Sequence, residues 1–158
     1  MIGNDIVDLA LARKESNWKR KGYLDKIFTS QEQFLIINSD NPEIMVWNLW
    51  SRKEAAYKIF NRQTGIRAFN PIQFENFEIE KNIGSVHAFN VVYFTKTEIT
   101  TEYIHSVCVT NKADFNTLKY LFSPEEIVKI NGLPHNKTTL KPVSKSNHGR
   151  FERLITLI

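Results

Sequence analysis

The sequence predicts an α+β protein in which an antiparallel sheet packs against one long helix. Residues 43–62 contain no glycine or proline and are rich in good helix formers, which is typical of a long helix. After Pro71 the apolar residues change to a strand-like period in runs that reach residue 110, which indicates an antiparallel meander. The chain of 158 residues is 42% hydrophobic, so it can form a packed core, and we expect a single domain over residues 1–158.

The composition restricts the class of protein and its partners. Lys and Arg total 21 against 17 Asp and Glu, and this net charge of +4 favours an anionic partner such as nucleic acid, an acidic protein or a phosphorylated small molecule. The chain carries no recognisable DNA- or RNA-binding motif, so we do not expect a nucleic-acid partner. No apolar run is long enough to cross a membrane and no secretory leader is visible, which predicts a cytoplasmic protein.

Cys108 is the only cysteine of the chain. A single cysteine excludes an internal disulfide and a cluster of cysteine metal ligands. The apolar residues around it predict a small buried side chain rather than a nucleophile.

The N-terminal segment is predicted to form a strand and then a basic helix. Residues 2–7 are short and β-branched, which is typical of a strand whose end enters a turn or a helix. From residue 9 to about residue 23 the composition is helical. This stretch carries five basic residues, namely Arg13, Lys14, Lys19, Arg20 and Lys21. Such a face is typical either of a solvated helix surface or of a docking surface for an acidic partner.

Two further helices are predicted on either side of a helix-breaking segment at 38–42. Thr29 or Ser30 suits the N-cap of the first helix, because Glu32 stands where the capping-box partner of Thr29 belongs. The second is the long helix 43–62, which ends near a glycine.

The remaining elements are predicted to be mostly strands. The meander has Gly84 and residues 96–101 in its turns. Residues 115–122 predict another helix, and the run 123–126 predicts the start of a short one. The polar tail that follows ends in a strand-like run at 151–158.

Two carboxylates and a lysine are placed as a magnesium–phosphate site requires. Asp5 lies at the end of the first strand, and Glu54 precedes Lys58 by one helical turn, on the same side of the long helix as Trp50. Magnesium prefers oxygen ligands from one or two carboxylates and from substrate phosphates, whose charge a nearby ammonium group neutralises. Spacing alone favours a simpler alternative, in which Glu54 and Lys58 form a surface ion pair and Asp5 is a turn residue.

Four sequence blocks favour the magnesium–phosphate site over this simpler alternative. They are Gly-Asn-Asp-Ile-Val-Asp at 3–8, Phe-Thr-Ser-Gln-Glu at 28–32, Trp-Ser-Arg-Lys-Glu-Ala-Ala-Tyr-Lys at 50–58 and Thr-Gly-Ile at 64–66. In their order and spacing they resemble the signature blocks of the 4′-phosphopantetheinyl transferase superfamily, and the resemblance covers roughly residues 1–110. The longer, two-repeat members carry a second acid where this chain has Val7, so the chain looks more like the short holo-acyl-carrier-protein synthase type.

The resemblance implies that 4′-phosphopantetheine is transferred from coenzyme A to a serine of an acyl or peptidyl carrier protein, in fatty-acid, polyketide or peptide synthesis. It implies Mg²⁺ as the cofactor, with Asp5 and Glu54 as its ligands. Lys53 and Lys58 should face the coenzyme phosphates, and the basic residues of the first helix should dock the acidic helix of the carrier. Either Glu54, through a metal-bound water, or Lys58 would relay the serine proton.

The tail from residue 111 carries two more blocks that resemble the family. Residues 131–134 and 144–151 are similar to its Gly-Lys-Pro and Ser-x-Ser-His-x-Gly-Arg blocks, which in other members do not come last. This order suits a permuted chain whose final strand joins the sheet, although a polar loop before an edge strand also explains it. The resemblance implies that Ser146, His148 and Arg150 contact the coenzyme.

Two departures leave a second function open. Leu133 replaces the usual lysine of the first tail block, and Asn147 stands where the histidine of the second block falls. The alternative is therefore a non-catalytic relative that binds coenzyme A or the carrier protein without transfer.

The number of repeats bears on assembly. The chain has the metal ligands of one repeat, and one repeat forms only half of the cleft. Half a cleft would leave apolar surface exposed to solvent. We therefore expect a homo-oligomer, a trimer ahead of a dimer, with coenzyme A at the interface between subunits. If residues 131–158 fold back to form the missing wall, one chain closes its own site and the protein is a monomer.

Overall fold

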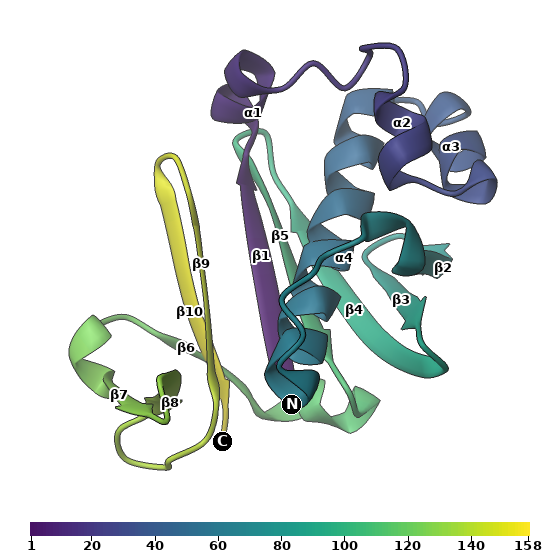
Figure 1. The fold of residues 1–158 in the computed structure, drawn as a ribbon. Coiled ribbons are helices and arrows are strands. Elements are labelled where there is room, and N and C mark those ends of the chain that lie inside the picture. The colour runs from purple at the N-terminus through teal and green to yellow at the C-terminus, as the bar shows by residue number, and fades with distance from the viewer.

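The computed structural model describes residues 1–158, apart from the side chain of Glu78. The long helix α4 (Pro42–Thr64) crosses one face of a five-stranded antiparallel sheet in the order β1-β5-β4-β3-β2 (Figure 1). The strands of this sheet are β1 (Ile2–Asp8), β2 (Glu75–Glu80), β3 (Ile83–Ala88), β4 (Val91–Ile99) and β5 (Tyr103–Val109). The predicted α+β fold, with an antiparallel sheet against a long helix, is confirmed.

The core lies between α4 and the sheet. Leu49, Ala55, Ala56 and Ile59 of the helix are fully buried against residues of the strands. Cys108 on β5 is buried among them, so the prediction of a small buried side chain is confirmed. None of the helices in the described part of the chain is long and apolar enough to cross a membrane.

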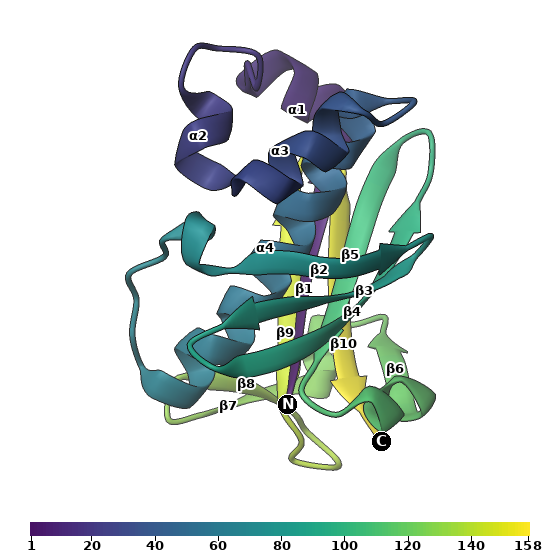
Figure 2. The same cartoon turned by 90° about the vertical axis from the view of Figure 1, so that its right-hand side faces the viewer.

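Three short helices gather at the N-terminal end of α4 (Figure 2). They are α1 (Leu9–Glu15), α2 (Tyr23–Ile27) and α3 (Ser30–Ile37). The helical stretch predicted from residue 9 to residue 23 is therefore split. Ser16 is extended, with φ −127° and ψ 129°, and Gly22 takes a left-handed φ of 82° directly before α2, so the chain turns between the two helices.

The predicted capping signals are confirmed. Glu32 N–H donates to Thr29 Oγ1 over 3.3 Å, and Thr29 N–H donates to Glu32 Oε1 over 3.0 Å, which closes the capping box of α3. The helix α4 starts after its N-cap Asn41 and ends at Gly65, whose φ is 74°. Both ends lie within two residues of the prediction.

The meander is confirmed, but its turns lie elsewhere than predicted. Between the two predicted turns the chain is interrupted at Phe89 and Asn90, which have left-handed φ angles of 51° and 64°. Two positive φ angles in a two-residue loop match the twist of a hairpin, so the chain reverses there between β3 and β4. Gly84 consequently lies inside β3, and β4 continues to Ile99. A 3₁₀ turn, η1 (Pro71–Gln73), leads into β2.

Residues 115–122 form a turn and a strand instead of the predicted helix. The turn η2 (Lys112–Thr117) leads into β6 (Leu118–Leu121), which pairs with the C-terminal strand. Leu118 faces Leu157 and Leu121 faces Leu154, so pairing with a distant strand overrides the local helical preference. At 123–126 the short helical element is a 3₁₀ turn, η3 (Pro124–Glu126).

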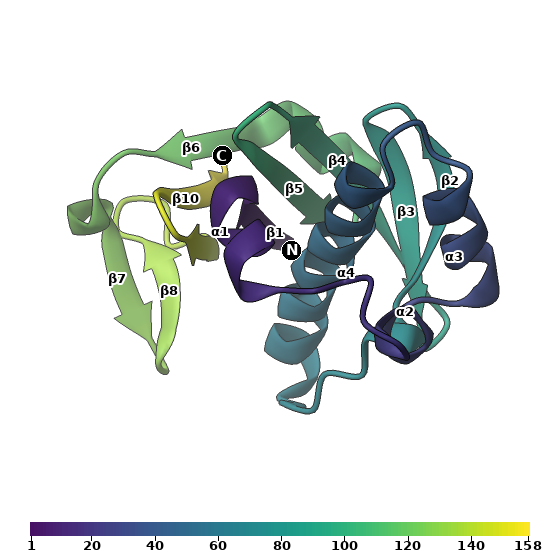
Figure 3. The ribbon, with the colours of Figure 1, turned by 90° about the horizontal axis from the view of Figure 1, so that it is seen from above.

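The last strands form a second, three-stranded sheet in the order β6-β10-β9. Its C-terminal strands are β9 (Val143–His148) and β10 (Phe151–Leu157), and β7 (Ile127–Ile130) and β8 (Leu133–Asn136) form a separate hairpin. Seen from above, β6, β7, β8 and β10 lie on one side of β1, and α4 with β2 to β4 lies on the other (Figure 3). The final strand β10 therefore does not join the five-stranded sheet as the permuted order suggested.

Instead, β9 lies beside β1 and is joined to it through side chains (Figure 1). Asn4 N–H donates to Ser144 Oγ over 2.9 Å, and Asp8 N–H donates to His148 Nδ1 over 2.8 Å. The two residues of each contact are 140 positions apart in the sequence. Because this separation is the same at both ends, the two strands run in the same direction. This arrangement brings the C-terminal segment to the edge of the first strand.

Candidate active site

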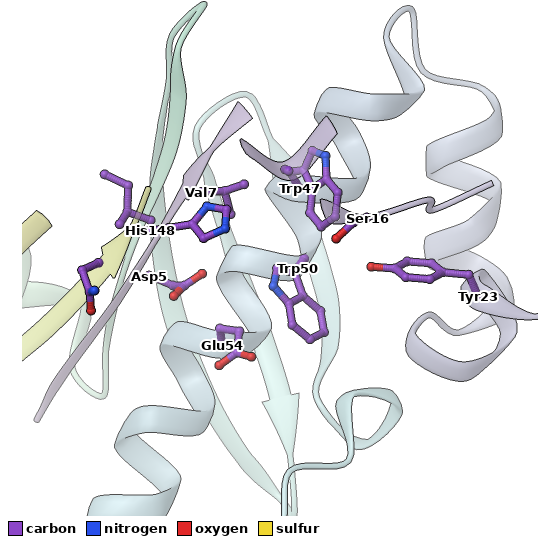
Figure 4. A pocket seen from close by; sticks show the side chains of 11 residues that line it. Asp5, Val7, Ser16, Tyr23, Trp47, Trp50, Glu54 and His148 are labelled. Carbon is purple, nitrogen blue, oxygen red and sulfur yellow. The ribbon is translucent and has the colours of Figure 1, made fainter. Parts of the chain in front are cut away.

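Asp5 and Glu54 meet in a pocket of about 270 Å³ between β1, α4 and β9 (Figure 4). The strand continues past Asp5 to Asp8, so Asp5 lies within β1 rather than at its end. Gly3 allows this strand to lie against α4, because a Cβ atom there would collide with the carbonyl oxygen of Ala55. Both carboxylates face the pocket in Figure 4.

Burial and mutual repulsion disfavour the charged forms of this pair. Burial, and then the negative charge of Asp5, raise the pKa of Glu54 to about 7, and Lys58 acts in the opposite direction. Burial also raises the pKa of Asp5, although the ammonium group of Lys58 opposes this shift. A divalent cation between the two carboxylates would relieve their repulsion, so this pair fits a magnesium ion.

Lys58 of α4 donates hydrogen bonds to β1 beside Asp5. Its Nζ donates to Asn4 O over 2.7 Å and to Asp5 Oδ1 over 3.2 Å. An ammonium group has three N–H donors, so one remains for a substrate oxygen. Nearly a third of the side chain is exposed, which leaves it accessible.

A second, basic pocket of about 220 Å³ lies beyond Lys58. Arg62 and Lys145 line it together with Leu133 and Pro134 of the first tail block. Arg62 Nη2 donates to Pro134 O over 3.0 Å, whereas its Nη1 is buried without a partner among the described residues. A guanidinium N–H in this situation suits a phosphate oxygen. Burial lowers the pKa of Arg62.

An aromatic wall borders the first pocket. It is formed by Trp47 and Trp50 of α4 and by Tyr23 of α2. In Figure 4 the hydroxyl of Tyr23 points into the pocket, and the indole nitrogen of Trp50 faces the side on which the two carboxylates lie. Burial raises the pKa of Tyr23, so its hydroxyl stays neutral and can donate a hydrogen bond.

The tail contributes Asn147 and His148 to the same pocket. His148 Nδ1 accepts the N–H of Asp8, and its Nε2 lies 3.4 Å from a carboxylate oxygen of Glu15. With Nδ1 accepting from Asp8, a proton on Nε2 is directed toward Glu15. Of the tail residues predicted to contact the coenzyme, the structure brings His148 to the site.

Ser146 and Arg150 lie outside the pocket. The guanidinium of Arg150 donates to both carboxylate oxygens of Asp8 over 3.0 Å and holds the pKa of that carboxyl well below its usual range. Asp8 also caps α1, so this ion pair fastens the tail to the first helix. The hydroxyl of Ser146 is buried. Neither residue lines the pocket, and their contact with the coenzyme stays a prediction.

Lys53 is also directed away from the pocket, contrary to the prediction that it faces the coenzyme phosphates. Its side chain is fully buried, and Nζ donates to Glu32 Oε1 over 2.7 Å and to Pro71 O over 2.9 Å. The reason is the geometry of the helix, because a residue adjacent to Glu54 points about 100° away from it. Lys53 is thus part of the core.

The predicted basic docking residues are all exposed: Arg13, Lys14, Lys19, Arg20 and Lys21. Arg13 also pairs with Glu43 over 2.9 Å. The loop that carries three of them runs from Ser16 to Tyr23, and both of these residues line the pocket. The basic surface therefore borders the mouth of the site.

Arg62, Lys145 and Tyr23 are among the pocket residues that were not predicted as site residues. Arg62 had a signal, because it continues the row of Trp50, Glu54 and Lys58 by one more step of four residues. Lys145 and Tyr23 carried no such signal, since the path of a loop and of the tail brings them to the pockets.

Two comparisons with known proteins gave matches. The family model of the 4′-phosphopantetheinyl transferase superfamily matches residues 1–117. Among solved structures, an apo-ACPS structure from Chronobacterium ammoiniagenes has a similar fold, with a TM-score of 0.55 and 14% sequence identity. The similarity covers 68% of this chain and 93% of that chain. No curated protein sequence matches significantly.

Proposed function

Because the chain belongs to the 4′-phosphopantetheinyl transferase superfamily, we propose that it transfers 4′-phosphopantetheine from coenzyme A to a serine of an acyl or peptidyl carrier protein. The observation that carries this proposal is that Asp5 and Glu54 line one pocket and that Lys58 donates a hydrogen bond to Asp5. We propose the holo-acyl-carrier-protein synthase type, which is supported by Val7, an apolar residue of the same pocket that cannot bind a metal ion.

In this reaction the serine oxygen bonds to the β-phosphorus of coenzyme A. The bond from that phosphorus to the bridging oxygen breaks, and adenosine 3′,5′-bisphosphate leaves with this oxygen. The free N–H of Lys58 is placed to donate to a phosphate oxygen, where negative charge accumulates. The sequence offers Glu54 and Lys58 as relays for the serine proton. Lys58 can accept it only as a neutral amine, so while its ammonium group donates to Asn4 and Asp5 the proton passes to the carboxylate of Glu54.

Asp5 and Glu54 would hold the Mg²⁺ ion. When bound, the ion supplies electrostatic stabilisation of the phosphate charge. The two buried carboxylates with raised pKa values support this assignment. Among the residues that the structure describes, no three His, Cys, Asp or Glu side chains form a cluster that could hold a metal. Magnesium retains waters and binds substrate phosphates, so two protein carboxylates are sufficient for it.

One assay tests the proposal. The protein is incubated with an apo carrier protein, coenzyme A and Mg²⁺, and the carrier is weighed by mass spectrometry. We expect the mass increment of phosphopantetheine on the carrier serine. Binding of coenzyme A without this increment would identify the non-catalytic relative that Leu133 and Asn147 leave open, and the absence of both would overturn the proposal.

We also propose that the acidic helix of the carrier docks on the exposed basic residues of α1 and of the loop after it. Their charge and their place at the mouth of the pocket support this docking. Charges of this kind accelerate association and make it dependent on salt.

Substitution of Lys58 by alanine is expected to lower kcat by about 100-fold and to change the KM for coenzyme A much less. The ammonium group acts mainly where charge accumulates in the transition state, so its loss affects the rate more than the affinity. Steady-state kinetics with a purified carrier measure both constants. A variant with normal kcat and a raised KM would reduce Lys58 to a contact with bound coenzyme.

The tail changes our expectation for assembly. Asn147 and His148 reach the pocket that holds Asp5 and Glu54, so one chain supplies the wall that a single repeat lacks. A tail that forms the missing wall of the cleft is the condition under which the sequence predicts a monomer. We therefore propose a monomer, and the expected trimer or dimer becomes the alternative assembly. We expect light scattering of the active protein to give a mass near 18.4 kDa at all concentrations. A trimer whose activity falls on dilution would restore the interface site.

A further inference from the structure

His105 of β5 lies on the face of the sheet that α4 does not cover. The next residue, Ser106, points toward α4, because its hydroxyl oxygen is 2.7 Å from that of Ser51. Successive residues of a strand face opposite sides of the sheet, so His105 points away from α4. Only 1% of His105 is exposed, and its ring lies beside Tyr120 of β6, with ring centroids 5.9 Å apart. It is thus a buried titratable side chain that does not line the active-site pocket.

The ring of His105 is hydrogen-bonded to the side-chain amide of Asn4 of β1. Nε2 of His105 lies 3.1 Å from Asn4 Nδ2. This amide nitrogen also lies 3.4 Å from the carbonyl oxygen of Arg153, which needs a donor, whereas Asn4 Oδ1 accepts from the hydroxyl of Ser144 over 2.7 Å. Asn4 therefore donates to an unprotonated Nε2. Burial, and then the charges of Arg153 and Lys58, lower the pKa of His105 to about 4, so the ring is neutral at neutral pH.

The backbone of Asn4 holds the ammonium group of Lys58. The strand β1 is at the edge of its sheet, so the N–H and C=O of Asn4 that face away from β5 bond to side chains. The N–H donates to Ser144 Oγ over 2.9 Å, and the carbonyl oxygen accepts from Lys58 Nζ over 2.7 Å. This carbonyl belongs to the peptide group that joins Asn4 to Asp5, the second acceptor of Lys58. These two bonds set the direction of the third N–H of Lys58.

His105 and Lys58 are therefore connected through Asn4 across β1, which has α4 on one side and β6 on the other (Figure 3). Resting on the proposed function, we infer that His105 is a positioning residue of the transfer reaction. It fixes the amide of Asn4, and Asn4 directs the free N–H of Lys58 toward the substrate phosphate. Without the acceptor of His105, an N–H of this amide would be buried without a partner, and Asn4 would shift to relieve it. A small misplacement of a catalytic group has a large effect on the rate.

Two substitutions of His105 provide the test. His105→Phe fills the site without an acceptor, whereas His105→Gln keeps a side-chain oxygen that can accept from Asn4. We expect His105→Phe to lower kcat about 10-fold and to change the KM and the calorimetric Kd of coenzyme A less than about 2-fold, and we expect His105→Gln to recover most of the rate. The matched control is His87→Phe. His87 of β3 is hydrogen-bonded to the Ser85 hydroxyl over 3.0 Å, and no hydrogen bond of the described residues links this pair to Asn4, so kcat should stay at the wild-type value.

A double substitution separates positioning from a general structural effect. In Lys58→Ala the group to be positioned is absent, so adding His105→Phe should lower kcat less than about 2-fold further. A structural disturbance would lower kcat by the same factor with and without Lys58, and this result would overturn the inference. A wild-type kcat in folded His105→Phe would overturn it as well. Thermal unfolding shows whether each variant is folded at the assay temperature, and His105→Leu takes the place of His105→Phe if the larger ring prevents folding.

The imidazole of His105 gives a readout that does not depend on activity. Nitrogen-15 NMR of the wild-type protein should show a neutral ring with its proton on Nδ1, because Nε2 accepts from Asn4. A proton on Nε2 would contradict this hydrogen bond and overturn the inference. A wild-type protein that transfers no phosphopantetheine would overturn the proposed function and this inference with it. Normal wild-type transfer with equal effects of His105→Phe in both backgrounds would overturn this inference alone.

Discussion

Glu54→Gln is expected to reduce phosphopantetheine transfer by about 100-fold or more while the protein stays folded. Glutamine keeps the size and the helix propensity of glutamate, so α4 should be unaffected. No described residue hydrogen-bonds the carboxylate of Glu54, which means that the substitution breaks no structural contact. What it removes is one of the two negative charges that would hold the metal ion.

Stability provides the second readout for this variant. In the metal-free protein burial, and then the charge of Asp5, raise the pKa of Glu54, and the second cause reflects repulsion between the two carboxylates. Neutral glutamine abolishes this repulsion, and we expect a Tm equal to or above that of the wild type. Loss of activity without loss of stability is what a functional residue should show.

The measurement combines the rate of carrier modification with a thermal unfolding curve. Glu80→Gln, an exposed carboxylate of β2, is the matched control and should retain full activity. Asp5→Asn should also be inactive, but Asp5 accepts a hydrogen bond from Lys58, so its loss is less simple to interpret. Near-normal transfer by folded Glu54→Gln would refute the metal-ligand assignment.

The sequence predicted those elements whose signals are local. The capping box of Thr29 and Glu32 and the left-handed Gly65 at the end of α4 each depend on a few neighbouring residues. The strand β6 could not be predicted in this way, because Leu118 to Leu121 become a strand through pairing with β10. The hairpin at Phe89 and Asn90 was missed because phenylalanine is an unusual residue at a positive φ.

The candidate site shows the same division. Glu54 and Lys58 follow from helical spacing and from the family blocks, and the structure brings both of them to Asp5. Tyr23 comes to the pocket through the folding of a loop, which no local pattern encodes. His148 was expected at the coenzyme from the tail block, and the structure brings it to the pocket. Lys53 was assigned to the coenzyme phosphates from its place in a sequence block, although helical geometry places it on a different face of α4 from Glu54.

Lys53→Ala is expected to lower the free energy of unfolding by about 3–5 kcal/mol. Lys53 Nζ and Glu32 Oε1 are 2.7 Å apart, and neither side chain is exposed. The other carboxylate oxygen, Oε2, accepts from the backbone and the side-chain amide of Asn76 over 3.0 and 2.6 Å. Glu32 therefore joins α3, α4 and β2, and without Lys53 it would be a buried charge with no cation beside it.

Urea unfolding of the variant measures this loss. Lys14→Ala, an exposed lysine of α1, is the control and should change the free energy by less than about 0.5 kcal/mol. The double substitution Glu32→Leu with Lys53→Met should lose less than the sum of the two single substitutions, because it leaves no unpaired charge. The double variant should not regain the full free energy of unfolding of the wild type, because Glu32 also caps α3 and accepts a hydrogen bond from Asn76.

The affinity for coenzyme A distinguishes this role from the one that the family block implied. A core lysine affects the amount of folded protein, so the Kd of the folded Lys53→Ala protein should equal that of the wild type. A lysine at the coenzyme phosphates would give the opposite result, with normal stability and a raised Kd. Since Lys53 is fully buried and Lys58, five residues later, lies beside Asp5, we expect the loss of stability at Lys53 and the loss of catalysis at Lys58.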